Sequence, residues 1–327
     1  MKKTTKWVAA GLGVVSTAAA GAFAGIRTVS KKLLSIAMDR EEPEILRKSK
    51  GKITGSPEVV TALQRSAEAA KVLESCGCTD VELISRDGIR LVGHFYECPT
   101  AKRIVIAMHG WRSSWAKDFG VISQFFHNND CSVLYAEQRA QNQSEGEYIT
   151  FGLLERYDCL DWIDWVNEEF GETVPIYLAG VSMGATTVLM TSGLELPSNV
   201  RGIVADCGFT SPHAIWKHVV EHNLHLSYSL HDAQVEKMVQ KRIKMSPQEY
   251  STVDALKECQ VPVLFIHGAE DSFVPVRMTY ENYRACSAPK ELLIVPGAEH
   301  GMSYIVEQEK YENTVRSFWA QHDGMTT

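Results

Sequence analysis

The sequence lacks the cysteine spacing of a disulfide framework. Its eight cysteines are scattered between positions 76 and 286 of 327 residues, and only Cys76 and Cys78 lie close together. Small disulfide-rich domains instead hold closely spaced cysteines in a short chain, so a framework of that kind is excluded. Cysteines inside strand or helix patterns act as small hydrophobic residues, which favours a reducing compartment. No further ligand accompanies the Cys-x-Cys pair, and we predict neither a metal site nor a cofactor.

Basic residues are scarce beyond the first 52 positions. Residues 1–52 hold eleven Lys and Arg against four Asp and Glu, whereas residues 53–327 hold 22 against 36. An acidic surface repels phosphates, which need a basic face, so we expect no nucleic-acid partner.

Long apolar runs are absent except near the N-terminus, where Trp7 to Ile26 contains no charge. Twenty helical residues span about 30 Å, the thickness of a bilayer core. An uncleaved membrane anchor, a cleaved signal peptide and a soluble helix are the three interpretations. We favour the anchor because the run exceeds the usual apolar length of a signal peptide. It predicts membrane association through an N-terminal helix on an undetermined side, whereas cleavage would give a secreted protein.

The remaining sequence alternates short apolar runs with helical patterns. An amphipathic helix is expected from Ser56-Pro57 to Gly77, followed by a hairpin of residues 81–85 and 90–96. Further strands are expected at 103–108, 131–136, 175–179, 201–206, 261–267 and 290–295. This alternation predicts an α/β fold, with a mostly parallel eight-stranded sheet and helices on both faces.

The most informative segment is Gly180-Val181-Ser182-Met183-Gly184, which reads G-x-S-x-G between a predicted strand and a possible helix. A serine at such a junction is held in a strained conformation that exposes its hydroxyl, and the flanking glycines leave room for the adjoining elements. Ser182 is therefore the candidate nucleophile.

Two polar residues downstream follow strand ends in the order that a Ser-Asp-His triad requires. Asp271 follows the strand at 261–267, and His300 follows the strand at 290–295. A serine hydroxyl needs a base to take its proton and an acid to orient that base. We therefore predict a catalytic triad of Ser182, Asp271 and His300.

Two ionisable residues close to Asp271 in the sequence are alternatives to the predicted triad members. Glu270 is the rival acid, but the pattern G-x-x-D-x-x-V-P favours Asp271, which leaves Glu270 as a solvated loop charge. His267 precedes the acid, and we interpret it as a packing or loop-orienting residue.

The motifs together resemble a known superfamily. They are His109-Gly110-Trp111, Gly180 to Gly184, Asp206-Cys207-Gly208-Phe209-Thr210-Ser211, Asp271 with Val274-Pro275, and Glu299-His300-Gly301-Met302-Ser303-Tyr304. Over roughly residues 80–320 the chain resembles serine esterases and prolyl-oligopeptidase-like members of the α/β-hydrolase superfamily. More closely, it resembles uncharacterised Gram-positive bacterial hydrolases with an N-terminal hydrophobic segment. These motifs are specific to the superfamily and not to a substrate.

The resemblance implies an oxyanion hole formed by the backbone N–H groups of Trp111 and Met183. The indole of Trp111 could equally form a wall of the acyl pocket. One departure is visible after the fourth strand, where relatives usually read D-x-R-G-H-G and this chain reads Glu137-Gln138-Arg139-Ala140-Gln141-Asn142. We expect the shape of that loop, and not the chemistry, to differ.

The resemblance also divides the chain. Residues 1–55 hold the anchor or signal segment and a basic linker, and residues 56–208 with 257–327 form the α/β-hydrolase core. Residues 209–256 form a helical cap insertion, which would exclude water and shape the substrate pockets.

A rival site lies inside the predicted cap. His218-Val219-Val220-Glu221-His222 reads H-x-x-E-H, a zinc pattern, and His225 follows on the same helical face. We prefer a polar cap helix whose histidines line the cleft or face solvent, because a five-residue pattern is weak without further context.

We predict a serine hydrolase that cleaves an ester-type acyl substrate through an acyl-enzyme. Its class would be a carboxylesterase or a lipid-directed acyl hydrolase acting on a small-molecule or lipid ester. A prolyl-oligopeptidase-like peptidase and an acyltransferase are the alternatives. A zinc-dependent hydrolase using His218 and His222, and a non-catalytic binding module, are minor ones.

Overall fold

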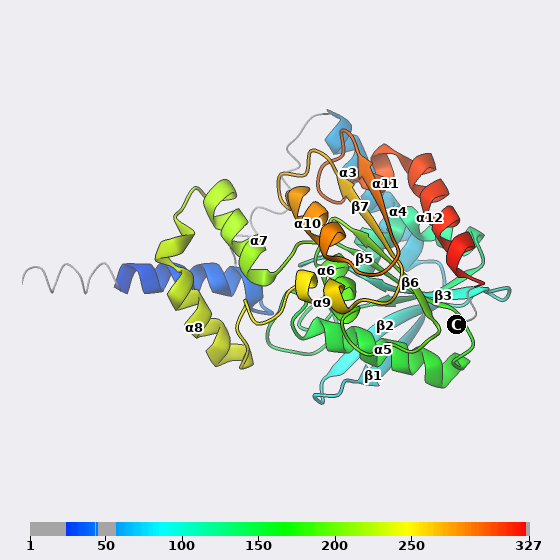
Figure 1. The fold of residues 1–327 in the computed structure, drawn as a ribbon, viewed down its shortest axis with the longest axis horizontal. Helices are drawn as coiled ribbons and strands as arrows, with labels where there is room; N and C mark the ends of the chain where they lie inside the picture. Colours follow the sequence, from blue (N-terminus) through cyan, green and yellow to red (C-terminus); the bar gives the residue numbers. More distant parts are fainter. Residues whose placement is uncertain (1–23, 43, 45–56, 325–327) are drawn as a thin grey trace, which may run out of the picture.

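A computed structural model describes residues 24–42, 44 and 57–324. Its centre is one eight-stranded sheet in the order β1-β2-β4-β3-β5-β6-β7-β8 (Figure 1). The strands are β1 Thr79–Ile84, β2 Arg90–Tyr96, β3 Arg103–Met108, β4 Cys131–Ala136, β5 Ile176–Val181, β6 Val200–Asp206, β7 Val263–Gly268 and β8 Lys290–Val295. Strand β2 pairs antiparallel with β1 and β4, and all other pairs are parallel. The predicted α/β-hydrolase fold is confirmed.

Helices cover both faces of the sheet because each face carries buried apolar side chains. The helices of this core are α3 Pro57–Glu74, α4 Trp115–Asn128, α5 Glu155–Phe170, α6 Met183–Thr191, α9 Thr252–Glu258, α10 Arg277–Ala285, α11 Ser303–Val306 and α12 Gln308–His322. One apolar cluster joins α3, α4 and α12 to one face, with Phe119 and Phe318 fully buried. A second cluster joins α5, α6 and α9 to the other face, centred on Trp162.

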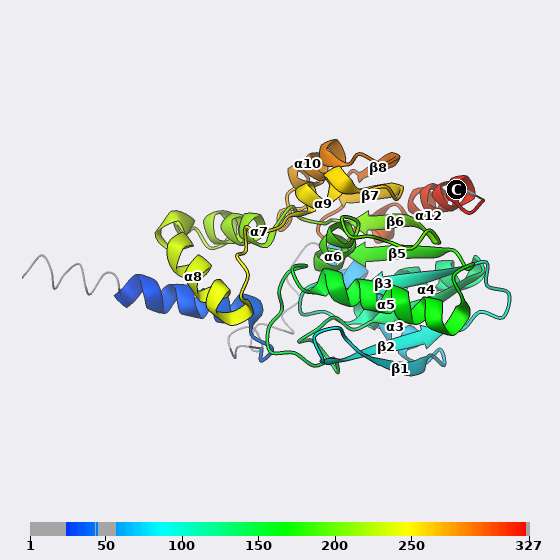
Figure 2. The same cartoon turned by 60° about the horizontal axis from the view of Figure 1, so that its bottom comes forward.

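The segment predicted as a cap forms a separate lobe beyond the carboxyl ends of the parallel strands (Figure 1 and Figure 2). The lobe contains α7 Pro212–His218, the π-helix Val219–Asn223, the 3-10 helix Tyr228–Leu230 and α8 Asp232–Ile243. An apolar cluster joins the lobe to the core, and Ile215, Val235 and Val239 of the lobe and Met183 and Val274 of the core contribute buried side chains to it. Helix α9 packs on α6 and α10 of the core instead, so the lobe ends before residue 252.

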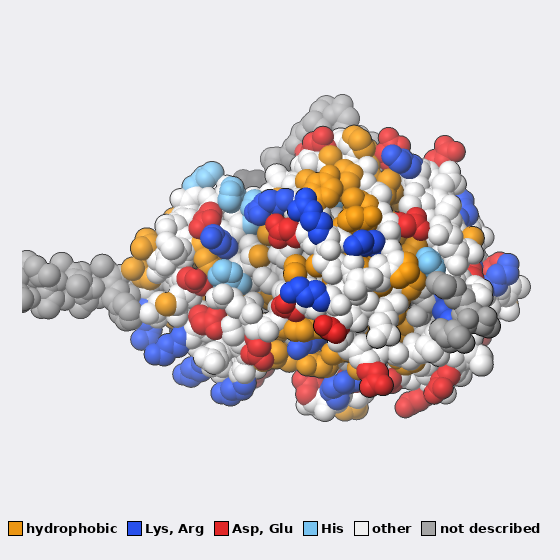
Figure 3. Space-filling model, in the orientation of Figure 1, with side chains coloured by type: hydrophobic (Ala, Val, Ile, Leu, Met, Phe, Trp, Pro, Cys, Tyr) orange, Lys and Arg blue, Asp and Glu red, His pale blue; other side chains and the backbone are white. Residues whose placement is uncertain are grey.

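A helix of residues 24–38, here called the N-terminal helix, packs along the lobe (Figure 2). Leu34 and Met38 are buried in the apolar cluster of the lobe, whereas Lys31 and Lys32 are exposed. Lys and Arg side chains gather along the edge formed by this helix and α8 (Figure 3). The helix is thus amphipathic, and residues 27–38 are not the polar linker that their basic composition predicts.

The predicted membrane association through an N-terminal helix is wrong. No helix among the described residues is both long enough and apolar enough to cross a bilayer. Residues 7–23 of the predicted anchor lie outside the described part of the chain, and its last three residues begin the N-terminal helix.

Candidate active site

The strand–turn–helix junction around Ser182 has the geometry of an exposed nucleophile. Strand β5 ends at Val181, helix α6 begins at Met183, and Ser182 between them adopts φ 55° and ψ −115°. A Cβ atom at Gly184 would lie 1.8 Å from the carbonyl oxygen of Met108, so only glycine fits there. This close packing holds the serine in a conformation that L-residues rarely adopt.

The three predicted triad side chains meet at the carboxyl ends of β5, β7 and β8. The Oγ of Ser182 lies 2.9 Å from Nε2 of His300, and Nδ1 of His300 lies 2.7 Å from Oδ2 of Asp271. Ser182 and Asp271 are buried, while the His300 side chain is 27% exposed. The serine can pass its proton to the imidazole, and the carboxylate can orient that imidazole.

The Asp271 carboxylate is held in its charged form. Its Oδ1 accepts hydrogen bonds from the backbone N–H groups of Phe273 and Val274 at 2.9 and 2.8 Å. Burial by itself raises the pKa of Asp271, but hydrogen bonds from His267, His300 and Val274 outweigh it and hold the pKa well below its ordinary value. The Asp271 carboxyl is therefore ionised in the folded protein at neutral pH.

The two neighbours of the triad take different places. The carboxylate of Glu270 accepts a hydrogen bond from the backbone N–H of Gly297 at 2.6 Å, at the exposed rim. His267 is fully buried, and its Nε2 lies 3.2 Å from Oδ2 of Asp271 and 2.8 Å from the Val274 carbonyl. The sequence identified His267 as loop-orienting but did not reveal its contact with Asp271.

The predicted oxyanion donors are both near the nucleophile, since Met183 directly follows Ser182 and Trp111 lines the same two cavities as Ser182. Met183 is the first residue of α6, where unpaired N–H groups of a helix point outward. The N–H of Gly110 donates to Asp118 at 2.6 Å, and the N–H of Arg112 donates to Gln141 at 2.5 Å. The backbone of Trp111 is thus fixed between two anchored neighbours, as an oxyanion donor needs to be.

The loop after β4 has a left-handed backbone at the two positions that are usually glycine in relatives. Ala140 and Asn142 occupy the glycine positions of the D-x-R-G-H-G pattern, and both have positive φ, 58° and 50°. Arg139 forms a buried ion pair with Asp158 and a second one with Asp87 at 2.8 Å. Side-chain contacts therefore hold a left-handed backbone that glycine adopts more readily.

Ser182 opens onto two cavities. The cap pocket, of about 480 Å³, lies between the N-terminal helix and the lobe, and the α3 cleft, of about 810 Å³, lies between α3 and α4. The cap pocket is lined almost wholly by apolar side chains, among them Leu33, Leu34, Ile36, Ala37, Phe151, Phe209, Trp216 and Val235. The α3 cleft is more mixed, and its wall includes Ala67, Lys71, Lys117, Met302 and Ile305. Trp111 and Phe273 line both cavities and separate them beside the nucleophile.

Phe273 is a site residue that sequence reasoning missed. Its ring lies 5.0 Å from the His300 imidazole, centroid to centroid, and it forms part of both cavity walls. The only signal was its position two residues after the predicted acid.

The histidines of the H-x-x-E-H pattern do not gather a third ligand. The rings of His218 and His222 stack at 4.5 Å, and Nε2 of His218 lies 3.3 Å from the Ser272 carbonyl. Within the described residues, the one group of three convergent ligand side chains is Cys207, Asp271 and His300, which includes two triad members. The pattern therefore reads as part of the lobe's helical packing.

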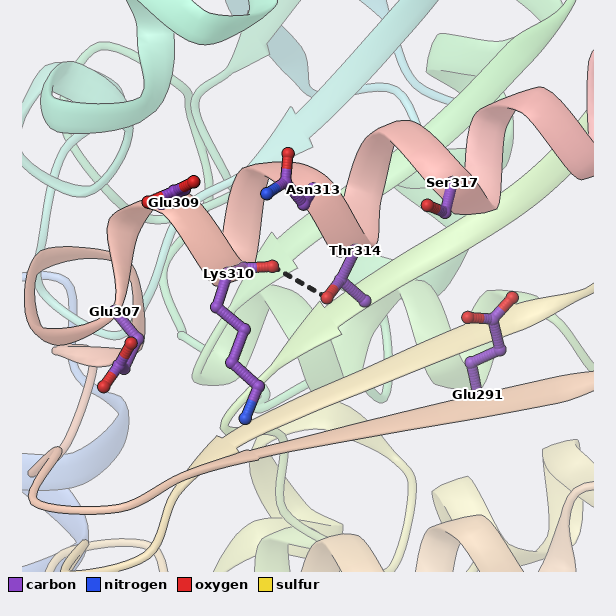
Figure 4. A pocket seen from close by; sticks show the side chains of 7 residues that line it. All are labelled: Glu291, Glu307, Glu309, Lys310, Asn313, Thr314 and Ser317. Carbon is purple, nitrogen blue, oxygen red and sulfur yellow. Dashed lines mark hydrogen bonds between the residues drawn. The ribbon is translucent and has the colours of Figure 1, made fainter.

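A further hollow along α12 lies away from the triad. Glu291, Glu307, Glu309, Lys310, Asn313, Thr314 and Ser317 line it (Figure 4). The hydroxyl of Thr314 donates to the Lys310 carbonyl at 2.8 Å, and the acidic side chains point in different directions (Figure 4). This arrangement has no convergent ligand set.

Comparison with known proteins agrees with this geometry. The model of the prolyl oligopeptidase family matches residues 151–326, just over half of the chain. The uncharacterized protein YqkD of Bacillus subtilis (strain 168) is 28% identical over 191 residues, which cover 57% of this chain and 61% of that protein. The chain thus spans less than two thirds of this relative.

Solved structures share the fold. The Pyrococcus furiosus esterase Pf2001 has a TM-score of 0.63 at 22% identity, over 76% of this chain and 92% of that chain. Est1E of Butyrivibrio proteoclasticus, solved with ferulic acid bound, has a TM-score of 0.60 at 17% identity, over 75% and 100%. The Pyrococcus horikoshii acylaminoacyl peptidase has a TM-score of 0.58 at 14% identity, over 79% and 44%.

Proposed function

The chain belongs to the prolyl oligopeptidase family and is a hydrolase of the α/β-hydrolase class, and from this premise we propose that it is a serine carboxylesterase. Its substrates would be esters of apolar acyl groups. The observation that carries the serine mechanism is the continuous chain of contacts from Ser182 through His300 to Asp271, at 2.9 and 2.7 Å, and the apolar cap pocket favours an apolar acyl group.

In the proposed mechanism, Ser182 attacks the ester carbonyl while Nε2 of His300 takes its proton. The N–H groups of Trp111 and Met183 stabilise the oxyanion, and each such donor is worth about 3 kcal/mol in comparable sites. His300 then protonates the leaving alcohol, and a water molecule activated by the same imidazole hydrolyses the acyl-enzyme. Asp271 stays ionised and stabilises the imidazolium in both halves of the reaction.

The two cavities support an ester with unlike ends. An apolar acyl chain gains free energy when it leaves water for the cap pocket, at about 25 cal/mol per Å² of buried surface. The α3 cleft, with Lys71 and Lys117 on its wall, suits a more polar leaving alcohol. Two solved structures of similar fold are esterases, which supports an ester as the substrate.

A peptidase is the second candidate. It is favoured by the family match and by the acylaminoacyl peptidase of similar fold. Both candidates use the same triad, so the substrate and not the site separates them.

Labelling with a fluorophosphonate tests the serine mechanism. We expect one adduct on Ser182 in the wild type and none in Ser182→Ala, with ester hydrolysis reduced roughly 10⁶-fold. Asp271→Asn should retain Ser182 but lose about 10⁴-fold in kcat, because the imidazole is no longer held in the right tautomer. An unlabelled wild type would favour a binding module over an enzyme.

Ester and amide substrates separate the two candidates. Nitrophenyl esters of increasing chain length, beside a proline amide, should show kcat/KM higher for the esters. A higher kcat/KM for the amide would assign the protein as a peptidase.

A further inference from the structure

We propose that the N-terminal helix is the specificity element of the active site, and that its apolar face sets the length of the acyl chain that the cap pocket accepts. This inference rests on the proposed ester hydrolysis and extends it to a substrate class, aliphatic acyl esters of limited chain length. Three sets of contacts carry it.

The first set places the helix in the pocket wall. Leu33, Leu34, Ile36 and Ala37 line the cap pocket opposite side chains of the lobe. Leu34 is only 2% exposed. One side of the pocket that opens at Ser182 is therefore built from residues 145 positions or more away in the sequence.

The second set ties the helix to the oxyanion loop. The indole Nε1 of Trp111 donates to the Ala37 carbonyl at 2.8 Å. The Arg112 guanidinium donates to the Ile36 carbonyl at 3.0 and 3.1 Å and to the Asp39 carbonyl at 2.6 Å. The last carbonyls of a helix have no partner within it, so these side chains satisfy them and fix the helix end beside the reacting carbon.

The third set ties the helix to the lobe and the core. Ser30 Oγ lies 2.9 Å from Nδ1 of His231, and both residues are buried. Arg242 of α8 pairs with Asp39 at 2.9 Å. The N–H of Ile149 donates to the Met38 carbonyl at 2.7 Å. Because its middle and its C-terminal end are fixed, the helix is a rigid wall, and a chain too long for the pocket meets it instead of displacing it.

Two substitutions in this wall should move chain-length preference in opposite directions. Ala37→Phe fills pocket space near the nucleophile, so kcat/KM for the longest esters that the wild type accepts should fall roughly tenfold or more. Leu34→Ala enlarges the pocket, so the preferred chain should lengthen by one to three carbons. In Ala37→Phe, short-chain esters such as acetate should lose less kcat/KM than long-chain esters do.

Ala67→Phe is the matched control, because it places the same bulk on α3 in the other cavity. We expect it to leave acyl preference unchanged and to alter the preference for the alcohol. Active sites are counted with a fluorophosphonate before each assay, so loss of folded protein is not mistaken for altered specificity.

Alkyl fluorophosphonates of increasing chain length give a readout that does not depend on ester turnover. Their rates of reaction with Ser182 should show the same opposite shifts in Ala37→Phe and Leu34→Ala. Equal shifts in Ala67→Phe, or an unchanged length profile in both helix variants, would overturn the inference. If the labelling rates depend on chain length as expected but no ester is hydrolysed, the proposed esterase function is refuted. The role of the N-terminal helix in setting chain length would still be supported.

Discussion

At the residue scale, His267 has partners that determine where its proton lies. Its Nε2 faces two acceptors, the Val274 carbonyl at 2.8 Å and the Asp271 carboxylate at 3.2 Å, so Nε2 must carry a hydrogen. Its Nδ1 lies 2.6 Å from the Thr279 hydroxyl, which can donate to it. His267 therefore contacts the same carboxylate oxygen of Asp271 as His300 does, and it acts on the reaction through that carboxylate.

Replacing His267 tests this positioning role. We expect His267→Leu to lower kcat roughly tenfold with little change in KM, because a hydrogen bond to a buried carboxylate is worth about 1.5 kcal/mol. His267→Gln keeps an N–H donor and should recover part of the loss. Steady-state kinetics on one short-chain ester measure both effects. If the two variants are equally impaired, only the packing of the ring matters.

The triad residues could be predicted from sequence because each is adjacent to a recognisable strand. Local backbone constraints are visible in the sequence at Gly180 and Gly184 and in the motif around Asp271. The contact of Phe273 with His300 depends instead on how β7 and β8 lie beside each other, and the contacts of His267 depend on how the chain after β7 folds back on that strand. No local sequence pattern records either arrangement.

At the element scale, the eight strands were predicted to within a few residues because parallel strands buried on both faces form uninterrupted apolar runs. The N-terminal helix was missed for the opposite reason. Its apolar residues follow a longer uncharged run, and its basic residues resemble a polar linker. Only the partners of Leu34 and Met38 in the lobe show that this stripe faces protein.

The end of α8 offers a test of helix capping. Lys244 follows the helix with φ 60° and ψ 18°, and its N–H donates to the Gln240 carbonyl at 3.0 Å. A left-handed conformation costs an L-residue about 1–2 kcal/mol, and glycine avoids this cost. The greater flexibility of glycine in the unfolded chain offsets part of that gain. Lys244→Gly should therefore raise the free energy of unfolding by about 0.5–1 kcal/mol.

Lys241→Gly is the matched control, because it makes the same change inside the helix. It should lower the free energy of unfolding by about 1 kcal/mol. Denaturant titrations of the three proteins compare the two effects. If both glycine substitutions lower the free energy of unfolding, the left-handed conformation at Lys244 carries no cost that glycine relieves.

At the scale of the whole molecule, the core, the lobe and the N-terminal helix meet at Ser182, and their interiors contain several histidines. Burial lowers the pKa of His109, His218 and His322, and it lowers the pKa of His127 to about 4. His94 is the exception, because hydrogen bonds to Glu137 and Asp80 outweigh its burial and raise its pKa.

These shifts fix the direction in which stability changes with pH. A histidine with a lowered folded pKa binds fewer protons in the folded than in the unfolded state, so its contribution weakens as pH falls below the unfolded value near 6.5. His94 has the opposite sign, because its contribution is present at low pH and is lost as pH rises through its folded pKa. The four histidines with lowered pKa values therefore lower the melting temperature as pH falls from 7 to 5, whereas His94 and the carboxyls whose pKa burial raises, among them Asp158 and Asp206, act in the opposite direction.

His127→Gln isolates one of these contributions. His127 stacks on Tyr96 at 3.5 Å, and its Nε2 lies 3.0 Å from the Tyr135 hydroxyl. Glutamine can keep the contact with that hydroxyl but does not titrate. The melting temperature of the variant should therefore fall less between pH 7 and pH 5 than that of the wild type, whatever its stability at pH 7. In His94→Gln the melting temperature should fall more than in the wild type, because the substitution removes a group that favours the folded state on acidification. Calorimetric scans across this pH range measure all three slopes, and a steeper slope in His127→Gln would contradict the assignment of a neutral, half-buried imidazole.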